Sequence, residues 1–251
     1  MSKFAEKLQS LSKSSTAPMG FHAAVSKVKS PSMLLIVELS AAQVKEAKMV
    51  TEVNADAGLI MSEGSSAQVL KQMIEAASNV PVGVFVKGVS EKETTELASL
   101  GCDFVVFDIK GAAGVLSKKE LGKFLMIEPS LDQGLVRAIN SFEVDGVFVG
   151  GGGDSPVAVE HLLVYRRFVE VLEKPVIITL PSLATKEELT NLRQAGVSGV
   201  IAASGQSVEA LAELKKTIDA LPREARGRRS RAGVVLPQYS GSVVDEEDED
   251  Q

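Results

Sequence analysis

Eight short apolar segments, rich in Val, Ile, Leu and Phe, recur along this chain and restrict its fold more than any other feature. Their starts lie 20 to 29 residues apart, which leaves room each time for a strand, a helix and two turns. Each segment is nearly continuous in hydrophobicity, as in strands buried on both faces of a parallel sheet. The segments span residues 33–39, 57–63, 81–87, 103–110, 123–128, 146–150, 175–180 and 199–203.

Stretches with helical periodicity separate these segments, as at residues 41–53, 67–79, 91–100, 157–172, 186–195 and 208–221. Eight strands that alternate with helices predict an α/β fold, a single (β/α)8 TIM barrel. The alternative is an open doubly wound sheet, which more often has fewer strands. We expect an N-terminal extension with a capping helix in residues 1–32, the barrel in 33–221 and a charged tail in 222–251. The helix is expected near Phe4 to Leu11, over the barrel floor.

An internal repeat supports the barrel, because four segments pass from a helix end into a strand in a similar way. They read NADAGLIMS, LGCDFVVFD, EVDGVFVGG and AGVSGVIAA. Residues such as Gly, Asn and Asp turn the chain from helix to strand at little conformational cost.

Charge is concentrated at the C-terminal end. The net charge of −6 comes from residues 245–250 (DEEDED), since without them 27 acidic residues face 27 Lys and Arg. The basic stretch that precedes these acidic residues predicts either a solvated tail or a contact with a nucleic acid or an acidic partner. Its arginines are Arg223, Arg226, Arg228, Arg229 and Arg231. The balanced body, two tyrosines and absence of tryptophan argue against nucleic acid as the main ligand.

A single cysteine, Cys102, excludes an intramolecular disulfide and paired-cysteine metal sites. No apolar run reaches the roughly 18 residues of a membrane helix, and the first 30 residues lack a signal-peptide core. We therefore expect a cytoplasmic protein with no membrane partner. His22 and His161 are expected to be packed or solvated, and Cys102 to lie in the core.

The polar residues that close the apolar segments are the candidate site, because TIM barrels bind at the carboxyl ends of their strands. Glu38, Lys87 and Glu128 each end an odd-numbered strand. We expect them to share one layer at the mouth, with Thr179 as its fourth member. Two carboxylates and an ammonium there predict acid/base chemistry, with Lys87 as proton donor or anion holder. The alternative is a structural ion-pair network that plugs the mouth.

Two further strand ends add candidates. Asp108 and Lys110 share a face at the end of the fourth strand, and Asp108 is expected to join the mouth. At the end of the second strand, alternation alone does not say whether Ser62 or Glu63 faces inward.

A glycine run follows the sixth strand. Gly150, Gly151, Gly152 and Gly153 allow a close backbone approach to a ligand, and Ser155 lies near a helix start. Free N–H groups at such a start bind anions, typically phosphate. The alternative is a flexible loop.

With Glu38, Lys87 and Glu128 in place, the chain resembles the ribulose-phosphate-binding (β/α)8 barrels, most of all indole-3-glycerol-phosphate synthase. That resemblance implies a catalytic glutamate at Glu38, a general-acid lysine at Lys87 and a second glutamate at Glu128. It also implies a phosphate contact at Ser204 and Gly205. Strand seven departs from the family, since it ends in TLPS where the family carries a phosphate-binding glycine motif.

These features predict a lyase- or isomerase-type enzyme that acts on a small phosphorylated or carboxylated metabolite. In one variant Lys87 forms a Schiff base, which the two glutamates disfavour because they stabilise the ammonium. The second hypothesis is a barrel that binds a phosphate-bearing ligand or a protein partner without turning it over. No cofactor is predicted, and a flavin (FMN) barrel is a third alternative.

Overall fold

The computed structural model describes residues 2–13, 31–40, 44–62, 65–150, 157–180 and 182–222. Within these ranges eight parallel strands close into a barrel in sequence order. They are β1 (Leu34–Ser40), β2 (Ala57–Met61), β3 (Val82–Val86), β4 (Phe104–Phe107), β5 (Gly122–Ile127), β6 (Gly146–Val149), β7 (Val176–Leu180) and β8 (Gly199–Ala202). The predicted TIM barrel is confirmed, and β8 pairs with β1 to close it.

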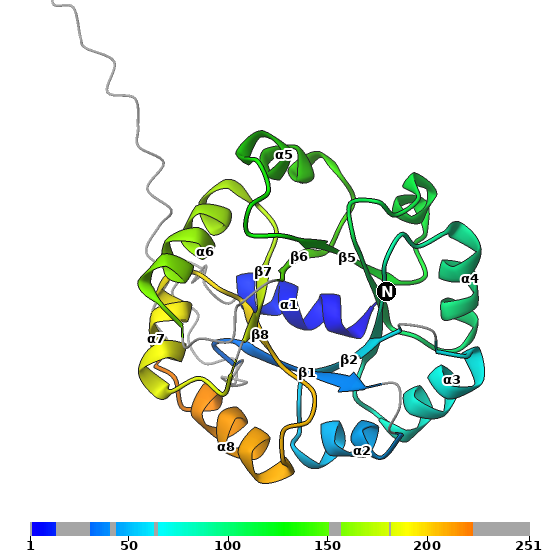
Figure 1. Cartoon of the computed structure of the whole chain (residues 1–251), viewed down its shortest axis with the longest axis horizontal. Coiled ribbons are helices and arrows are strands. Elements are labelled where there is room, and N and C mark those ends of the chain that lie inside the picture. Colours follow the sequence, from blue (N-terminus) through cyan, green and yellow to red (C-terminus); the bar gives the residue numbers. More distant parts are fainter. Residues whose placement is uncertain are drawn as a thin grey trace, which may run out of the picture.

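Helices surround the barrel on its outer side (Figure 1). They are α2 (Val44–Glu52), α3 (Ala67–Ala76), α4 (Glu91–Ser99), α5 (Gln133–Ala138), α6 (Val159–Val171), α7 (Lys186–Gln194) and α8 (Val208–Asp219). Between β4 and β5 the connection carries only a short 3-10 helix, η1 (Ala113–Ser117), and a second one, η2 (Ile139–Ser141), follows α5. Several strands are shorter than the apolar segments, so Lys87, Asp108 and Glu128 each lie just beyond a strand end.

Two apolar cores result from the alternation of side chains along the strands. The outer core fills the space between strands and helices, with members such as Leu35, Val105 and Ile178. The inner core lies inside the barrel and takes the intervening positions, with members such as Leu34, Ile36 and Ile201. This alternation fixes which residues face the interior.

The N-terminal helix α1 (Lys3–Lys13) closes the floor of the barrel, where Figure 1 shows it inside the ring of strands. Phe4 is fully buried and stacks on Phe104 with ring centroids 4.6 Å apart. Phe124 and Phe148 continue this aromatic group at centroid distances of 5.2 to 5.4 Å. A side chain on Gly83 would overlap the ring of Phe104, so the glycine makes room for the group.

Asp103 fastens α1 to the barrel. Its carboxylate accepts hydrogen bonds from the backbone N–H groups of Lys3 (2.8 Å) and Phe4 (3.0 Å) and from the Ser2 hydroxyl (2.7 Å). A negative charge at a helix N-terminus also interacts favourably with the helix dipole.

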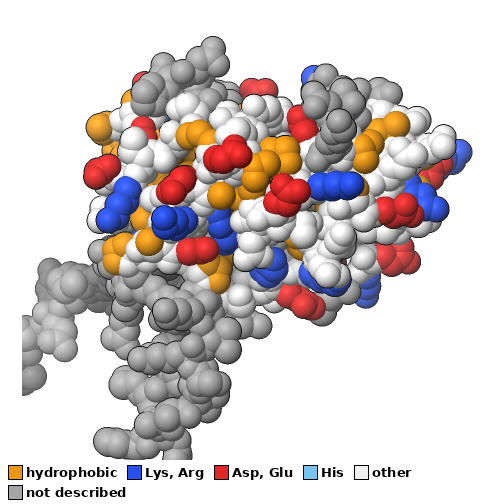
Figure 2. All heavy atoms as spheres, turned by 90° about the horizontal axis from the view of Figure 1, so that it is seen from below, with side chains coloured by type: hydrophobic (Ala, Val, Ile, Leu, Met, Phe, Trp, Pro, Cys, Tyr) orange, Lys and Arg blue, Asp and Glu red, His pale blue; other side chains and the backbone are white. Residues whose placement is uncertain are grey.

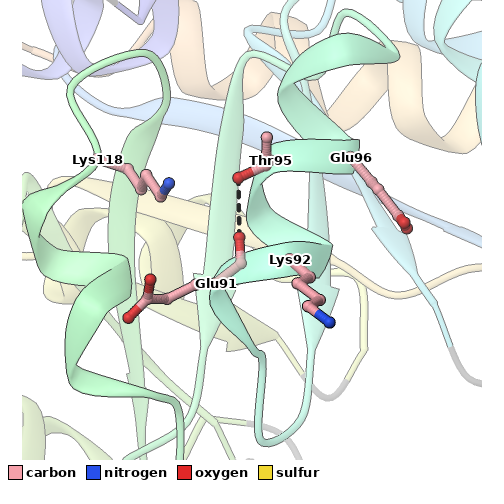
Figure 3. A pocket seen from close by; sticks show the side chains of 5 residues that line it. All are labelled: Glu91, Lys92, Thr95, Glu96 and Lys118. Atoms are coloured by element: carbon pink, nitrogen blue, oxygen red, sulfur yellow. Dashed lines mark hydrogen bonds between the residues drawn. The ribbon is translucent and has the colours of Figure 1, made fainter.

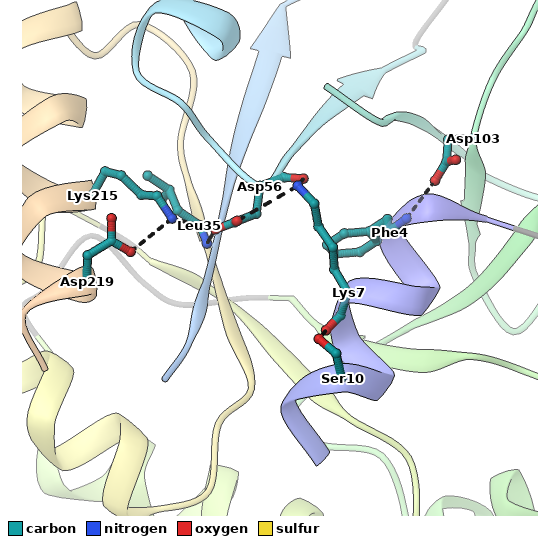
Figure 4. Close-up of polar contacts among 8 residues, drawn as sticks. All are labelled: Phe4, Lys7, Ser10, Leu35, Asp56, Asp103, Lys215 and Asp219. Atoms are coloured by element: carbon teal, nitrogen blue, oxygen red, sulfur yellow. Dashed lines mark hydrogen bonds and ion pairs between the residues drawn. The ribbon is translucent and has the colours of Figure 1, made fainter. Parts of the chain in front are cut away.

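A second polar cluster on the floor is centred on Asp56 (Figure 4). Its carboxylate accepts from the Leu35 N–H at 2.9 Å and from Lys215 Nζ at 2.9 Å, while Lys7 Nζ donates to its carbonyl oxygen. Burial lowers the pKa of Lys215, but Asp56 and Asp219 outweigh this, and the pKa lies above its ordinary value. The cluster therefore links α1, α8 and the start of β2 through charges that remain paired.

The repeat seen in the sequence occupies four equivalent positions. The residue before each even-numbered strand donates its N–H to the start of the preceding strand, at 2.7 to 2.9 Å. The donors are Asp56, Asp103, Asp145 and Ser198, and the acceptors are the carbonyls of Leu35, Val82, Lys123 and Val176.

We predict that Phe4→Ala lowers the free energy of unfolding by about 3 to 5 kcal/mol, because it leaves a cavity in a fully buried aromatic group. Urea denaturation followed by circular dichroism measures this change. Phe142→Ala is the matched control, since that ring is 50% exposed, and it should cost far less. Equal losses in the two variants would show that α1 does not stabilise the barrel floor.

Candidate functional site

The candidate site is the carboxyl end of the barrel interior. Ile36 and Ile177 belong to the inner core, and two residues further along the same strands lie Glu38 and Thr179. Lys87, Asp108 and Glu128 continue the inward positions of Phe85, Val106 and Met126. All five residues therefore stand on the inward register at the mouth.

The strand registers place these residues at different depths. Barrel strands tilt relative to the barrel axis, so paired residues on neighbouring strands do not lie at the same height. To stay at one height, each step to the next strand moves from the paired residue to the residue that follows it in sequence. Traced in this way through the observed pairs, the layer of Glu38 contains Phe85, Met126 and Thr179 and returns to Glu38. Lys87 and Glu128 lie nearer to the solvent, level with Ser40. The prediction that Glu38, Lys87 and Glu128 share one layer is therefore wrong, because apolar segments do not define strand stagger.

Glu38 is half-buried in the layer that also contains Phe85, Met126 and Thr179. The hydroxyl of Ser204, in the loop after β8, donates a hydrogen bond of 3.3 Å to its Oε1. Burial raises the pKa of Glu38, the Ser204 hydrogen bond lowers it, and the nearby charge of Glu46 raises it again. The net effect is a pKa above the ordinary value of 4.5, so this carboxyl holds a proton more readily than a solvated glutamate.

Glu46, in the first turn of α2, is the residue that sequence reasoning missed. Its Oε2 accepts a hydrogen bond of 2.8 Å from the Ser40 N–H, which ties the start of α2 to the end of β1. An acidic residue in the first turn of a helix is common and stabilising. Nothing in the sequence therefore distinguishes Glu46 from an ordinary helix-start glutamate.

Lys87 and Glu128 are both exposed to solvent. Among the residues that the structure describes, no ion pair joins Lys87 to Glu38 or to Glu128. The side chain of Glu128 instead accepts a long hydrogen bond of 3.4 Å from the Ser130 hydroxyl. The described part of the mouth thus lacks the ion-pair plug that was the structural alternative.

The carboxylate of Asp108 is hydrogen-bonded to the backbone of two loop residues. Its Oδ1 accepts hydrogen bonds from the N–H groups of Gly88 at 2.9 Å and Lys110 at 3.2 Å. The Lys110 side chain is exposed.

The glycine run is described only at its first residue. Gly150 is half-buried at the end of β6 and donates its N–H to the Ile127 carbonyl at 3.0 Å. Gly151, Gly152, Gly153 and Ser155 lie outside the described residues. After β8, Gly205 has a φ of +81°, a conformation that favours glycine.

Three of the remaining candidates, Ser62, His161 and Cys102, are described by the structure and do not face the barrel interior. Ser62 falls on the outward register of β2 and its hydroxyl donates to the Phe85 carbonyl at 2.7 Å, while Glu63 lies outside the described residues. His161 Nδ1 accepts from the Ala158 N–H at 3.0 Å at the start of α6, and His22 is not among the described residues. Burial raises the pKa of Cys102 to about 12, as expected of a core thiol.

A shallow hollow of about 400 Å³ lies on the outer surface between α4 and η1 (Figure 3). Glu91, Lys92, Thr95, Glu96 and Lys118 line it, and the Thr95 hydroxyl donates to the Glu91 carbonyl within α4. All five lining residues are of charged or polar type, whereas hydrophobic and aromatic residues predominate in a typical ligand pocket. Figure 2 likewise shows acidic and basic side chains interspersed on one face, without a block of one sign.

In the ranges that the structure covers, no group of three or more His, Cys, Asp or Glu side chains could hold a metal ion. None of the described helices is long and apolar enough to cross a membrane.

Comparison with known proteins gives a fold likeness. No protein-family model matches the chain, and no curated protein matches it in sequence. A solved tryptophan synthase from M. tuberculosis, in an open form with BRD0059 bound, matches with a TM-score of 0.64 and 15% identity over 87% of this chain and 98% of that chain. Its aminoacrylate-bound form matches with a TM-score of 0.63 and 14% identity over 88% and 99%.

A mutant tryptophan synthase alpha-subunit from the hyperthermophile Pyrococcus furiosus matches with a TM-score of 0.58 and 14% identity, over 76% of this chain and 98% of that chain. At such identities the likeness establishes the (β/α)8 fold alone. The narrower resemblance to indole-3-glycerol-phosphate synthase stays a prediction.

We predict that Glu38→Gln stabilises the protein increasingly as the pH rises above about 4.5. A raised pKa means that the folded protein binds this proton more tightly than the unfolded chain. In the wild type the stabilisation from Glu38 is therefore present at low pH and is lost as the pH passes through the raised pKa, whereas glutamine removes that loss.

Urea unfolding at a series of pH values measures the effect, with Glu128→Gln as the exposed charge control in the same mouth. A constant difference between Glu38→Gln and wild type across the pH series would contradict the raised pKa.

Proposed function

We propose that this barrel is an enzyme of lyase or isomerase type that moves a proton on a small anionic metabolite at its mouth. The observation that carries the proposal is the environment of Glu38. This carboxyl is half-buried, lies level with Phe85 and Met126, accepts a hydrogen bond from Ser204 and has a raised pKa. A carboxyl in such surroundings exchanges protons closer to neutral pH, as general acids and bases do.

Ser204 orients the carboxyl of Glu38 in this proposal. Its hydrogen bond engages Oε1, which leaves Oε2 to face the substrate. Thr179 lies in the same layer and offers a hydroxyl that can donate to an oxygen of the bound molecule. Glu46 has an electrostatic part, since its charge increases the proton affinity of Glu38.

Lys87 attracts and holds the anionic group of the substrate. Its exposed ammonium has no ion-pair partner in the part of the chain that the structure describes, so its charge is available to a ligand. The glycine run that begins at Gly150 and the Ser204–Gly205 turn are the backbone segments proposed to contact the same group. The barrel fold shared with tryptophan synthases is compatible with lyase chemistry and does not identify a substrate.

Exchange of substrate hydrogens with solvent tests the proposal. The full chain in D2O is incubated with a panel of phosphorylated sugars and small carboxylates, and proton NMR follows the loss of C–H signals. Glu38→Gln should slow exchange by about 10² to 10⁴-fold, the usual contribution of a general acid or base. Lys87→Met should mainly raise the half-saturating substrate concentration. Exchange that is unchanged in Glu38→Gln would overturn the assignment of Glu38.

A chain that ends at Leu221 serves as a further control. The enzyme proposal expects unchanged exchange, because no residue after Leu221 has a part in it. Binding without exchange, lost on this truncation, would favour the non-catalytic alternative, in which the arginine-rich tail engages a partner.

A further inference from the structure

We propose that Asp108 is a positioning residue that holds the turn carrying Lys87, rather than a group that exchanges protons with the substrate. The inference rests on the function proposed above, in which Lys87 holds the anionic group. It concerns the two loops after β3 and β4, which are neighbours because these strands pair from Gly83 with Phe104 to Val86 with Phe107.

The carboxylate of Asp108 bridges both loops. Its Oδ1 accepts the N–H of Gly88 from the loop after β3 and the N–H of Lys110 from its own loop. An oxygen engaged by two backbone donors is poorly placed for proton exchange with a ligand. It is well placed to fix the backbone that provides the donors.

A second hydrogen bond joins the same two loops, from the N–H of Ala112 to the carbonyl of Val89 at 2.8 Å. Within the loop after β4, the N–H of Gly111 donates to the carbonyl of Asp108 at 3.0 Å. Val89 is fully buried, and a Cβ on Gly111 would lie within 3.1 to 3.3 Å of Phe107, Asp108 and Val89. The two loops are thus packed against each other as well as hydrogen-bonded.

Gly88 determines the direction of the turn. Its φ is +63°, in the left-handed region that favours glycine, and a Cβ there would meet nothing within 4 Å. The residue is therefore glycine for its conformation and not for space. That conformation turns the chain directly after Lys87, at the residue whose N–H donates to Asp108.

Lys87 sits between these two fixed points. Val86 before it is held in the sheet by its pairing with Phe107, and Gly88 after it is held by Asp108. The backbone of Lys87 is thereby fixed on both sides while its side chain remains exposed. Loss of the hydrogen bond between Gly88 and Asp108 should free the backbone after Lys87, so that the ammonium group samples a larger volume.

The comparison of Asp108→Ala with Asp108→Asn tests this inference. Both variants remove the negative charge, but asparagine keeps an oxygen that can accept from Gly88, so any difference between them reports the hydrogen bonds and not the charge. Amide hydrogen exchange at Gly88 should be about tenfold or more faster in Asp108→Ala than in Asp108→Asn.

Phosphate affinity supplies the functional readout, with inorganic phosphate as the probe in an NMR titration of the full chain. Asp108→Ala should bind phosphate about tenfold more weakly than Asp108→Asn, and this difference should vanish when Lys87→Ala is added to both. Asp132 is the matched control, since its Oδ1 also accepts two backbone N–H groups, from Gly134 and Leu135, in a different loop. The variants Asp132→Ala and Asp132→Asn should bind phosphate with equal affinity.

The outcomes separate the inference from the proposed function. Equal Gly88 exchange in the two Asp108 variants, or an affinity difference that persists without Lys87, would overturn the positioning role. The remaining outcome is faster Gly88 amide exchange in Asp108→Ala, combined with a phosphate affinity that Lys87→Ala does not change. It would support the positioning role of Asp108. That result would instead refute the anion-holding role of Lys87.

Discussion

The aromatic group of Phe4, Phe104, Phe124 and Phe148 is the interaction on which the rest of the structure depends. A closed sheet of eight strands encloses a space that side chains must fill, and here large rings fill its lower part. Because α1 completes that filling from below, polar side chains on the inward register are found at the opposite end. The lower part of the interior is therefore apolar, and the inward polar residues lie at the mouth.

Burial divides the polar residues of the mouth into two kinds. Glu38 lies deep enough for its surroundings to raise its pKa, whereas Lys87 and Glu128 face solvent. The deeper position of Glu38 lowers the stability of the folded protein once its carboxyl is charged. Groups with a pKa shifted by burial are common in sites of proton transfer. In the proposed function, the outer position lets the charge of Lys87 attract a ligand without prior desolvation. Depth in the barrel thus separates the task proposed for Glu38 from the task proposed for Lys87.

The sequence was sufficient to predict the barrel, the number of strands and the helix at the floor, because each depends on periodicity and spacing. Glu38 and Lys87 show where such reasoning ends. Both close an apolar segment, but the stagger between strands arises from tilt and closure, which the chain as a whole determines. The contact between Asp108 and Gly88 was beyond prediction, because it joins two loops that are separate in sequence. The influence of Glu46 on Glu38 was missed for another reason, since an acidic residue in the first turn of a helix is common.

The attachment of α1 has a consequence for the order of assembly. Asp103 lies about one hundred positions after the helix that it fastens, and the rings that receive Phe4 belong to β4 and β5. During synthesis α1 is made before β4 and β5, so its binding surface does not exist until about one hundred further residues have followed. A helix that precedes every strand of the barrel is thus one of the later elements to find its place, and its eleven residues are too few to form a stable helix before they do so.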